Sequence, residues 1–210
     1  YFPKGQQPRA AIPYQFYNLA GVTRRIGLID DKKWAEVEES ITVVEKLNEN
    51  MKSETPLKDN LGKQLASEIK GYVPFIYAPR LFESVAYRYC TQFNENSKSP
   101  AATNFYPEAF HNSVMAREGV EEILGGLCAV IIQDPKEYPR LNKKIKISVE
   151  LMRETFGNVV TVEARGESNL ARMMSALIQA DYASAYLGLL YGIDPSTTES
   201  IRILKASMEN

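Results

Sequence analysis

The single histidine of the chain and a glutamate that precedes it are the side chains best suited to acid–base chemistry. His111 lies in the segment PEAFHN at residues 107–112, and Glu95 lies in the segment NENSK at residues 94–98. A carboxylate and an imidazole can each accept a proton and return it. The pair therefore indicates proton transfer. The simpler interpretation is that His111 is held by a structural hydrogen bond and that Glu95 is a solvated surface acid.

Few other side chains suggest a reaction. Arg9 precedes a predicted helix and could meet either an anionic group or solvent. The segment GESN at residues 166–169 lies between a predicted strand and a predicted helix, so its N–H groups could bind an anion, or Ser168 could cap the helix. Asp181 lies in an apolar helix, where a buried carboxylate needs a partner. No Gly-x-Ser-x-Gly pattern marks a nucleophile.

The composition limits the possible partners. The chain has 210 residues, of which 44% are hydrophobic and 24% charged, and a net charge of −1. This is an ordinary globular composition, and the length suits one core or one domain with an appendage. Because there is no basic excess, binding to nucleic acid or to an anionic membrane is not expected. The longest apolar run, residues 127–132, is too short to span a bilayer.

Both cysteines are predicted to be buried free thiols. Cys90 and Cys128 lie in apolar surroundings, and two cysteines with one histidine cannot build a zinc site. The pair of glycines at 125–126 precedes a strand, so it lacks the context of a phosphate-binding loop. These patterns therefore indicate neither a zinc site nor a phosphate-binding loop, and free thiols without a visible signal peptide favour the reducing cytoplasm.

The first part of the chain is predicted to be helical. Hydrophobic residues at helical spacing predict helices over residues 12–27, 32–51 and 57–69. Asp30 and Asp31 are suited to cap the second of these. Residues 1–71 are therefore predicted to form a helical flanking segment.

From residue 72 onward, strands alternate with helices. Apolar runs predict strands at 73–78, 101–104, 127–133 and 159–164; the predicted helices are 81–94, 108–112, 136–156, 170–191 and 197–208. This order predicts an α/β domain over residues 72–210, with a parallel sheet between two layers of helices. Ligands of such sheets gather at the carboxyl ends of the strands. His111 follows a predicted strand, so it lies where a site is expected.

The segments around Glu95 and His111 together resemble a known family. NENSKSPA at 94–101, followed by PEAFHN at 107–112, is similar to the carboxyl-terminal part of the bifunctional phosphoglucose/phosphomannose isomerases, which belong to the sugar isomerase (SIS) superfamily. The agreement continues, in order, over nearly the whole chain; the other similar segments are PRAA at 8–11, PFIY at 74–77, GESNLAR at 166–172, DYASAYL at 181–187 and GIDP at 192–195 with Ile201, Leu204 and Lys205.

The resemblance implies a SIS-type fold and an aldose–ketose isomerase. Its substrates would be glucose 6-phosphate and mannose 6-phosphate, each interconverted with fructose 6-phosphate, with no metal or organic cofactor. The residue matching Glu95 would move the proton between C1 and C2 of the sugar through a cis-enediol. The residue matching His111 would assist ring opening from across the interface of a homodimer.

The resemblance also implies three substrate-binding residues. Arg9 would stabilise the enediolate, since a guanidinium carries a permanent positive charge. Lys205, which by default is a surface lysine, would reach the sugar from the last helix. Thr198 would lie beside the sugar, although Thr197 and Ser196 are rivals for that position.

One part of the family's site has no counterpart in this chain. The family has a first SIS domain with a Ser/Thr-rich loop that holds the substrate phosphate, and no such loop is found here. We therefore expect the chain to correspond to the carboxyl-terminal part and to lack a complete site. The alternatives are a non-catalytic, phosphosugar-binding regulatory module and a dimerisation domain that pairs through residues 170–191. The presence of both Glu95 and His111 favours the enzyme.

Overall fold

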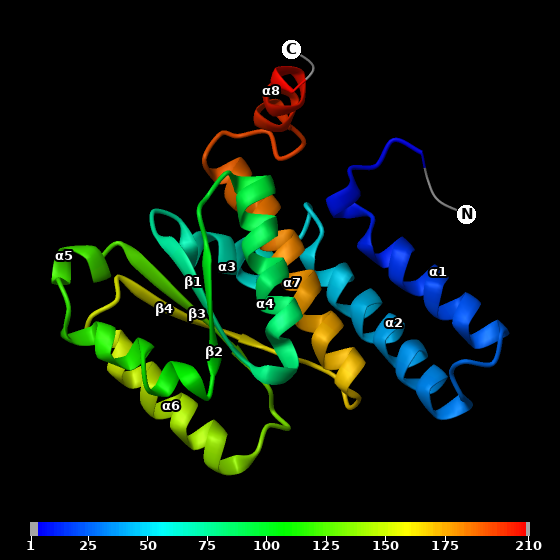
Figure 1. The fold of residues 1–210 in the computed structure, drawn as a ribbon, viewed down its shortest axis with the longest axis horizontal. Helices are drawn as coiled ribbons and strands as arrows, with labels where there is room; N and C mark the ends of the chain where they lie inside the picture. The colour runs from blue at the N-terminus through cyan, green and yellow to red at the C-terminus, as the bar shows by residue number, and fades with distance from the viewer. Residues whose placement is uncertain (1–3, 209–210) are drawn as a thin grey trace.

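The centre of the molecule is a parallel β-sheet. The computed structural model describes residues 4–208, and the strands found there form one sheet in the order β2-β1-β3-β4. Their bounds are Val73–Pro79 for β1, Ala102–Tyr106 for β2, Leu127–Gln133 for β3 and Asn158–Glu163 for β4. All three pairings are parallel, as Figure 1 shows. The four predicted strands are thus confirmed.

Helices cover both faces of the sheet. Their bounds are Ile12–Arg25 for α1, Asp31–Met51 for α2, Leu61–Ile69 for α3, Glu83–Gln92 for α4, Glu121–Leu124 for α5, Pro139–Arg153 for α6, Asn169–Leu190 for α7 and Glu199–Ser207 for α8. In Figure 1, α6 lies on one side of the sheet and α3, α4 and α7 on the other. The predicted three-layer α/β fold is therefore confirmed.

Alternation along the strands builds two separate cores. On β3, Cys128 and Val130 face α3, α4 and α7, whereas Ala129 and Ile131 face α6. All four are fully buried. Since successive side chains of a strand point to opposite faces, a strand buried on both sides must be apolar throughout. This is why the apolar run at 127–132 is continuous.

The amino-terminal helices extend the helical layer rather than forming a separate body. Helix α2 packs against α7, where the Tyr182 hydroxyl bonds to Asn48 and the Tyr186 hydroxyl donates to the carbonyl of Met51 at 2.6 Å. Helix α1 packs on α2 and lies on the outside of the molecule (Figure 1). The division of the chain at residue 71 stays a prediction.

Capping residues set several helix boundaries. The Asp30 carboxylate accepts the N–H of Lys33 at 2.7 Å and begins α2, as predicted. Asn60 likewise accepts the N–H of Lys63 at 2.9 Å, so the predicted helix at 57–69 is divided into a 3-10 turn, Leu57–Asp59, and α3. The predicted helix at 136–156 is shorter, because Pro139 occupies a first-turn position of α6.

No helix within residues 4–208 is long and apolar enough to cross a bilayer.

Candidate active site

Two side chains far apart in the sequence meet at one end of the molecule. A guanidinium N–H of Arg9 lies 3.4 Å from a carboxylate oxygen of Glu95, and the two side chains are 6% and 39% exposed. Both line a cavity of about 180 Å³, together with Thr198 and residues of the first turn of α8. The resemblance had implied roles for all three residues, and the structure brings them together. Arg9 is therefore not the solvated loop arginine of the simpler interpretation.

A π-helical turn presents Glu95. Helix α4 is followed by the π turn Phe93–Ser97, which ends at Lys98 in the left-handed conformation with φ 56°. This replaces the single helix predicted at 81–94. A π turn inserts an extra residue and turns side chains away from the positions that an α-helix would give them. Here the turn directs both Glu95 and Asn96 toward Arg9.

The close approach of this turn to α7 depends on a glycine. A Cβ added at Gly188 would lie 2.8 Å from the carbonyl oxygen of Asn96, closer than real Cβ atoms come. The same atom would lie 3.3 Å from the ring of Pro195. A residue without a side chain at 188 therefore lets the π turn and the loop after α7 pack together.

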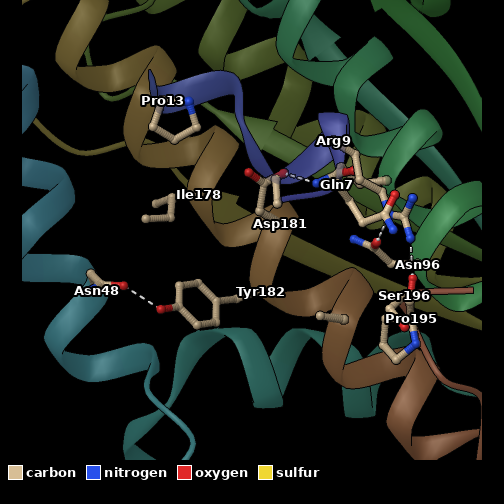
Figure 2. Close-up of a pocket in the computed structure, with 13 residues that line it drawn as sticks. Gln7, Arg9, Pro13, Asn48, Asn96, Ile178, Asp181, Tyr182, Pro195 and Ser196 are labelled. Atoms are coloured by element: carbon tan, nitrogen blue, oxygen red, sulfur yellow. Dashed lines mark hydrogen bonds between the residues drawn. The ribbon is translucent and has the colours of Figure 1, made fainter. Parts of the chain in front are cut away.

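Three groups hold the Arg9 guanidinium. Its Nε donates to the Asn96 side-chain oxygen at 2.8 Å, and a terminal nitrogen donates to the carbonyl of Pro195 at 2.5 Å. The third group is Glu95. Arg88 donates in turn to the backbone carbonyl of Arg9. Figure 2 shows Asn96 and Pro195 on the same side of Arg9.

A second cation belongs to the same cavity. The Lys98 ammonium donates to the backbone carbonyls of Glu95 and Thr197, the latter at 2.9 Å. Burial lowers the pKa of Lys98, and the positive charge of Arg9 lowers it further. The cavity is therefore lined by two positive groups, Arg9 and Lys98, and by two carboxylates, Glu95 and Glu199. Such a lining suits a ligand rich in oxygen groups that can donate and accept hydrogen bonds.

The cavity is not at the expected edge of the sheet. Helices α4 and α7 run back from the carboxyl ends of β1 and β4. The π turn after α4, which carries Glu95, and the loop after α7, which carries Pro195, therefore lie toward the amino ends of the strands. The carboxyl-end rule was applied to His111 and not to the NENSK segment, which follows a predicted helix, and the Arg9–Glu95 cavity lies at the opposite edge from His111. Figure 1 shows the end of α4 near α8, away from the segment that follows β2.

His111 lies on the other side of this fold. It follows β2 and the 3-10 turn Glu108–Phe110, whereas Glu95 precedes β2. The four residue steps of β2 separate the two edges by about 13 Å at 3.3 Å per residue. His111 is exposed, and within residues 4–208 its imidazole has no hydrogen-bond partner. The structural-histidine interpretation is thus not supported, and one chain does not bring His111 to Glu95.

The residues of the last segment differ in position. Thr197 and Thr198 both line the cavity, but the Thr197 hydroxyl donates to the carbonyl of Asp194 at 3.0 Å. The Thr198 hydroxyl has no hydrogen-bond partner among residues 4–208, so it is the freer of the two. Ser196 lines a neighbouring cavity instead. Lys205 is exposed on α8, beyond the residues that line the Arg9–Glu95 cavity.

That neighbouring cavity, of about 550 Å³, lies between the segment before α1 and helix α7 (Figure 2). Asp181 lines it, and burial raises the pKa of this carboxyl although Arg88 and Gln92 oppose the shift. Arg88 Nε lies 3.3 Å away and the Gln92 amide donates at 2.5 Å. Asp181 therefore has the partners that a buried carboxylate needs, and both are structural.

The GESN segment is closed to an external anion. Ser168 accepts the N–H of Ala171 at 3.1 Å and caps α7. The Glu39 carboxylate of α2 accepts the N–H groups of Glu167 and Ser168, at 2.5 and 3.0 Å. Hydrogen bonds from Ser168, and then from Glu167, lower the pKa of Glu39. An internal carboxylate thus occupies this helix end.

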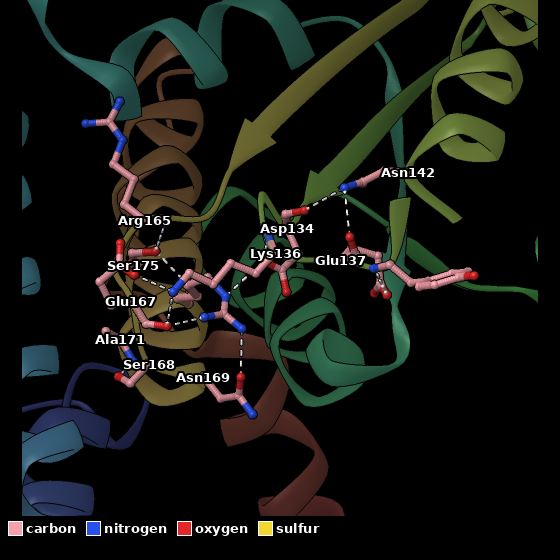
Figure 3. A network of polar contacts seen from close by, with 12 residues as sticks. Asp134, Lys136, Glu137, Asn142, Arg165, Glu167, Ser168, Asn169, Ala171 and Ser175 are labelled. Atoms are coloured by element: carbon pink, nitrogen blue, oxygen red, sulfur yellow. Dashed lines mark hydrogen bonds and ion pairs between the residues drawn. The ribbon is translucent and has the colours of Figure 1, made fainter. Parts of the chain in front are cut away.

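The polar network at the carboxyl ends of β3 and β4 is equally structural. Asp134 and Arg172, which are 4% and 5% exposed, form an ion pair at 2.8 Å. Arg172 also donates to the Glu167 carbonyl and to Asn169, and Lys136 contacts Glu167 (Figure 3). These bonds tie the two strand ends to α7. No cluster of metal-binding side chains was found in the described part of the chain.

Sequence reasoning missed three contributors to the site. Asn96 and Lys98 lie in the NENSK segment, whose polarity inside an apolar chain was the available signal. The carbonyl of Pro195 gave no signal, because a backbone acceptor carries no side-chain pattern.

Comparison with known proteins agrees with these features. Residues 58–208 match the model of the family described as "Bacterial phospho-glucose isomerase C-terminal SIS domain". The bifunctional phosphoglucose/phosphomannose isomerase of Caldicellulosiruptor bescii is 36% identical over 204 residues, which is 97% of this chain and 60% of that protein. The protein of the same name from Aquifex aeolicus is 34% identical over 209 residues, covering 99% and 60%.

Solved structures show the same fold. A glucose-6-phosphate isomerase-like protein from Thermus thermophilus superposes with a TM-score of 0.62 at 24% identity, covering 75% of this chain and 51% of that one. The C-terminal domain of glucosamine-fructose-6-phosphate aminotransferase from Francisella tularensis gives a TM-score of 0.59 at 13% identity, with coverage of 79% and 47%.

The chain spans about 60% of the length of the curated relatives that it matches. The family match covers most of the chain, and the relatives share more than 30% of its residues. The chain therefore belongs to the bacterial phosphoglucose isomerase C-terminal SIS domain family, as the segments around Glu95 and His111 predicted.

Proposed function

We propose that this chain supplies the proton-transfer residues of an aldose–ketose isomerase. The reaction interconverts glucose 6-phosphate, and mannose 6-phosphate, with fructose 6-phosphate. The observation that carries the proposal is the meeting of Glu95 and Arg9 at 3.4 Å in a cavity that also contains Thr198. The names of the relatives, bifunctional phosphoglucose/phosphomannose isomerases, support the same reaction.

The two residues suit the two needs of this chemistry. The C–H group of a sugar next to its carbonyl is a weak acid, so a base must lie within hydrogen-bonding reach and the enediolate oxygen must be stabilised. The partly exposed Glu95 carboxylate takes the proton from C2 and returns it to C1. Arg9, almost fully buried, provides a fixed positive charge beside that carboxylate.

Other residues complete the proposal. Thr198 and Lys205 contact the sugar hydroxyls, and His111 assists ring opening. Because His111 lies at the far edge of its own sheet, it would serve the site of a second copy in a homodimer. The phosphate would be held by the part of the relatives that this chain does not match, so residues 1–210 alone are expected to lack full turnover.

Substitution of the base tests the proposal. In the native protein, Glu95→Gln should lower kcat for fructose 6-phosphate formation by at least ~1,000-fold, while calorimetry still detects glucose 6-phosphate binding. Glu83→Gln, an exposed carboxylate on α4 outside the cavity, is the matched control and should leave kcat unchanged. Full turnover by Glu95→Gln would refute the role of Glu95.

The same experiment distinguishes the isomerase from the regulatory alternative. A phosphosugar-binding module would bind glucose 6-phosphate in both the wild type and the variant, and neither would turn it over. Full turnover by residues 1–210 alone would refute the expectation that the site is incomplete in this chain.

A further inference from the structure

We infer that Asn96 is a positioning residue, which holds the Arg9 guanidinium in the orientation that the reaction requires. The inference rests on the proposed function of Arg9. Asn96 is 8% exposed and is the neighbour of Glu95 in the π turn. Asn96 therefore contacts Arg9 from the same π turn that presents Glu95, the proposed base.

Asn96 contacts Arg9 at Nε, the nitrogen that joins the planar guanidinium to the rest of the side chain. The Asn96 oxygen accepts from Arg9 Nε at 2.8 Å, while the Pro195 carbonyl accepts from a terminal nitrogen at 2.5 Å. Two acceptors on different nitrogens of a planar group fix both its place and its tilt. Without Asn96, only the Pro195 carbonyl and the longer contact to Glu95 would remain, and Nε would have no acceptor.

A chain of hydrogen bonds determines which end of the Asn96 amide faces Arg9. The backbone carbonyl of Asp181 can only accept, so the Ser184 hydroxyl donates to it at 3.0 Å. That hydroxyl therefore accepts from the Asn96 amide nitrogen at 2.9 Å. The Asn96 oxygen is left to face Arg9. The orientation of the amide is thus set by helix α7.

The arrangement leaves donors free for a ligand. A guanidinium has five N–H groups. One donates to Asn96, one to Pro195 and one lies 3.4 Å from Glu95, so two remain. Because Arg9 lines the cavity, the inference is that these two donate to an oxygen of the substrate while the group stays fixed. Orienting a charged group before the reaction avoids the cost of reorganising it during the reaction.

A purely structural role for Asn96 would also explain its burial, since the same amide ties the π turn to α7. The two roles differ in their coupling to Arg9. A positioning residue loses its effect on kcat when Arg9 is absent, whereas a structural residue keeps its effect.

A double-mutant cycle in the native protein tests the inference. We expect Asn96→Ala to lower kcat by about 30-fold with KM changed less than about threefold, and Arg9→Ala to lower kcat by about 300-fold. The double variant should lie within about threefold of Arg9→Ala. Gln179→Ala is the control: it removes a buried side-chain amide of α7 that donates to the Glu163 carbonyl and does not contact Arg9. It should change kcat by less than about threefold.

A second variant covers the case in which Asn96→Ala does not fold. Ser184→Ala leaves Asn96 in place but removes the group that orients its amide, so kcat should fall about fivefold in the wild type and not in Arg9→Ala. If the kcat loss of a double variant equals the product of the losses of its two single variants, in either cycle, the inference is overturned.

A measurement that does not depend on turnover separates the inference from the proposed function. The Nε–H proton of Arg9 should exchange slowly with solvent in the wild type and rapidly in Asn96→Ala, as observed by NMR. A wild type that lacks isomerase activity would overturn the proposed function and with it the positioning role. An active wild type with equal exchange in both proteins would overturn the inference alone.

Discussion

Replacement of Gly188 by alanine should damage the site and the fold together. The new Cβ would lie 2.8 Å from the carbonyl oxygen of Asn96 and 3.3 Å from Pro195. To restore ordinary contact at 3.4 Å, the π turn must move by 0.6 Å, which is 3.4 minus 2.8. That turn carries Glu95, so the base moves with it.

The size of the effect follows from two opposing contributions. Glycine is less favourable than alanine inside a helix by about 1 kcal/mol, so the substitution gains this amount. Overpacking of a close contact costs about 1–3 kcal/mol. The net result is a loss of about 0–2 kcal/mol in the free energy of unfolding. Because a 1 Å misplacement costs about 100-fold in rate, a shift of roughly half that size should lower kcat about tenfold.

Gly21→Ala is the matched control. Gly21 lies inside helix α1, and a Cβ added there meets nothing within 4 Å. This variant should gain up to about 1 kcal/mol and keep the wild-type kcat. Urea unfolding and the isomerase assay measure both quantities. Equal stabilisation by the two substitutions, or an unchanged kcat in Gly188→Ala, would refute the steric reasoning.

Three further predictions concern buried and titrating groups. Arg172→Leu leaves a buried carboxylate unpaired and should cost about 3–5 kcal/mol in urea unfolding, whereas Arg153→Leu, which breaks an exposed pair, should cost under about 0.5 kcal/mol. Burial raises the pKa of Cys90 to about 11 and that of Cys128 to about 12, so neither native thiol should react with a disulfide reagent at pH 8 until urea is added; a fast native reaction would show that they are accessible. The hydrogen bonds at the start of α7 hold the pKa of Glu39 below its usual value, so its stabilisation is present above pH 4.5 and is lost as the pH falls through the lower native pKa. Glu39→Gln should therefore be less stable than the wild type by about 0.5 kcal/mol at pH 7, and this difference should shrink as the pH falls below 4.5. A difference that does not change with pH would contradict the assignment.

The sequence was sufficient to predict the layers of the fold. The strand predicted at 127–133 has the bounds of β3, and its continuous apolar run at 127–132 packs on both faces of the sheet. Helix lengths were less predictable where a local group competed with the hydrophobic pattern. Asn60 interrupts the helical pattern at 57–69 because its side chain satisfies the N–H of Lys63.

The position of the site could not be read from topology alone. The rule that ligands lie at the carboxyl ends of parallel strands favoured His111, but the Arg9–Glu95 pair formed at the opposite edge. The burial of Arg9 was also unpredictable, because the Pro195 carbonyl that accepts from it comes from 186 residues away. The family resemblance suggested which residues to consider, and only the structure showed which groups hold Arg9.

The exposure of helix α8 limits how tightly this helix can hold a ligand. No residue of Glu199–Ser207 is buried, so its helical state is supported by little packing. Isolated helices shorter than about 12 residues are marginal in water. Its amide protons should therefore exchange with deuterium far sooner than those of α7, as a separate opening unit. Any affinity contributed through Lys205 is then scaled down by the fraction of time for which α8 is folded, and a bound sugar that contacts it would slow that exchange.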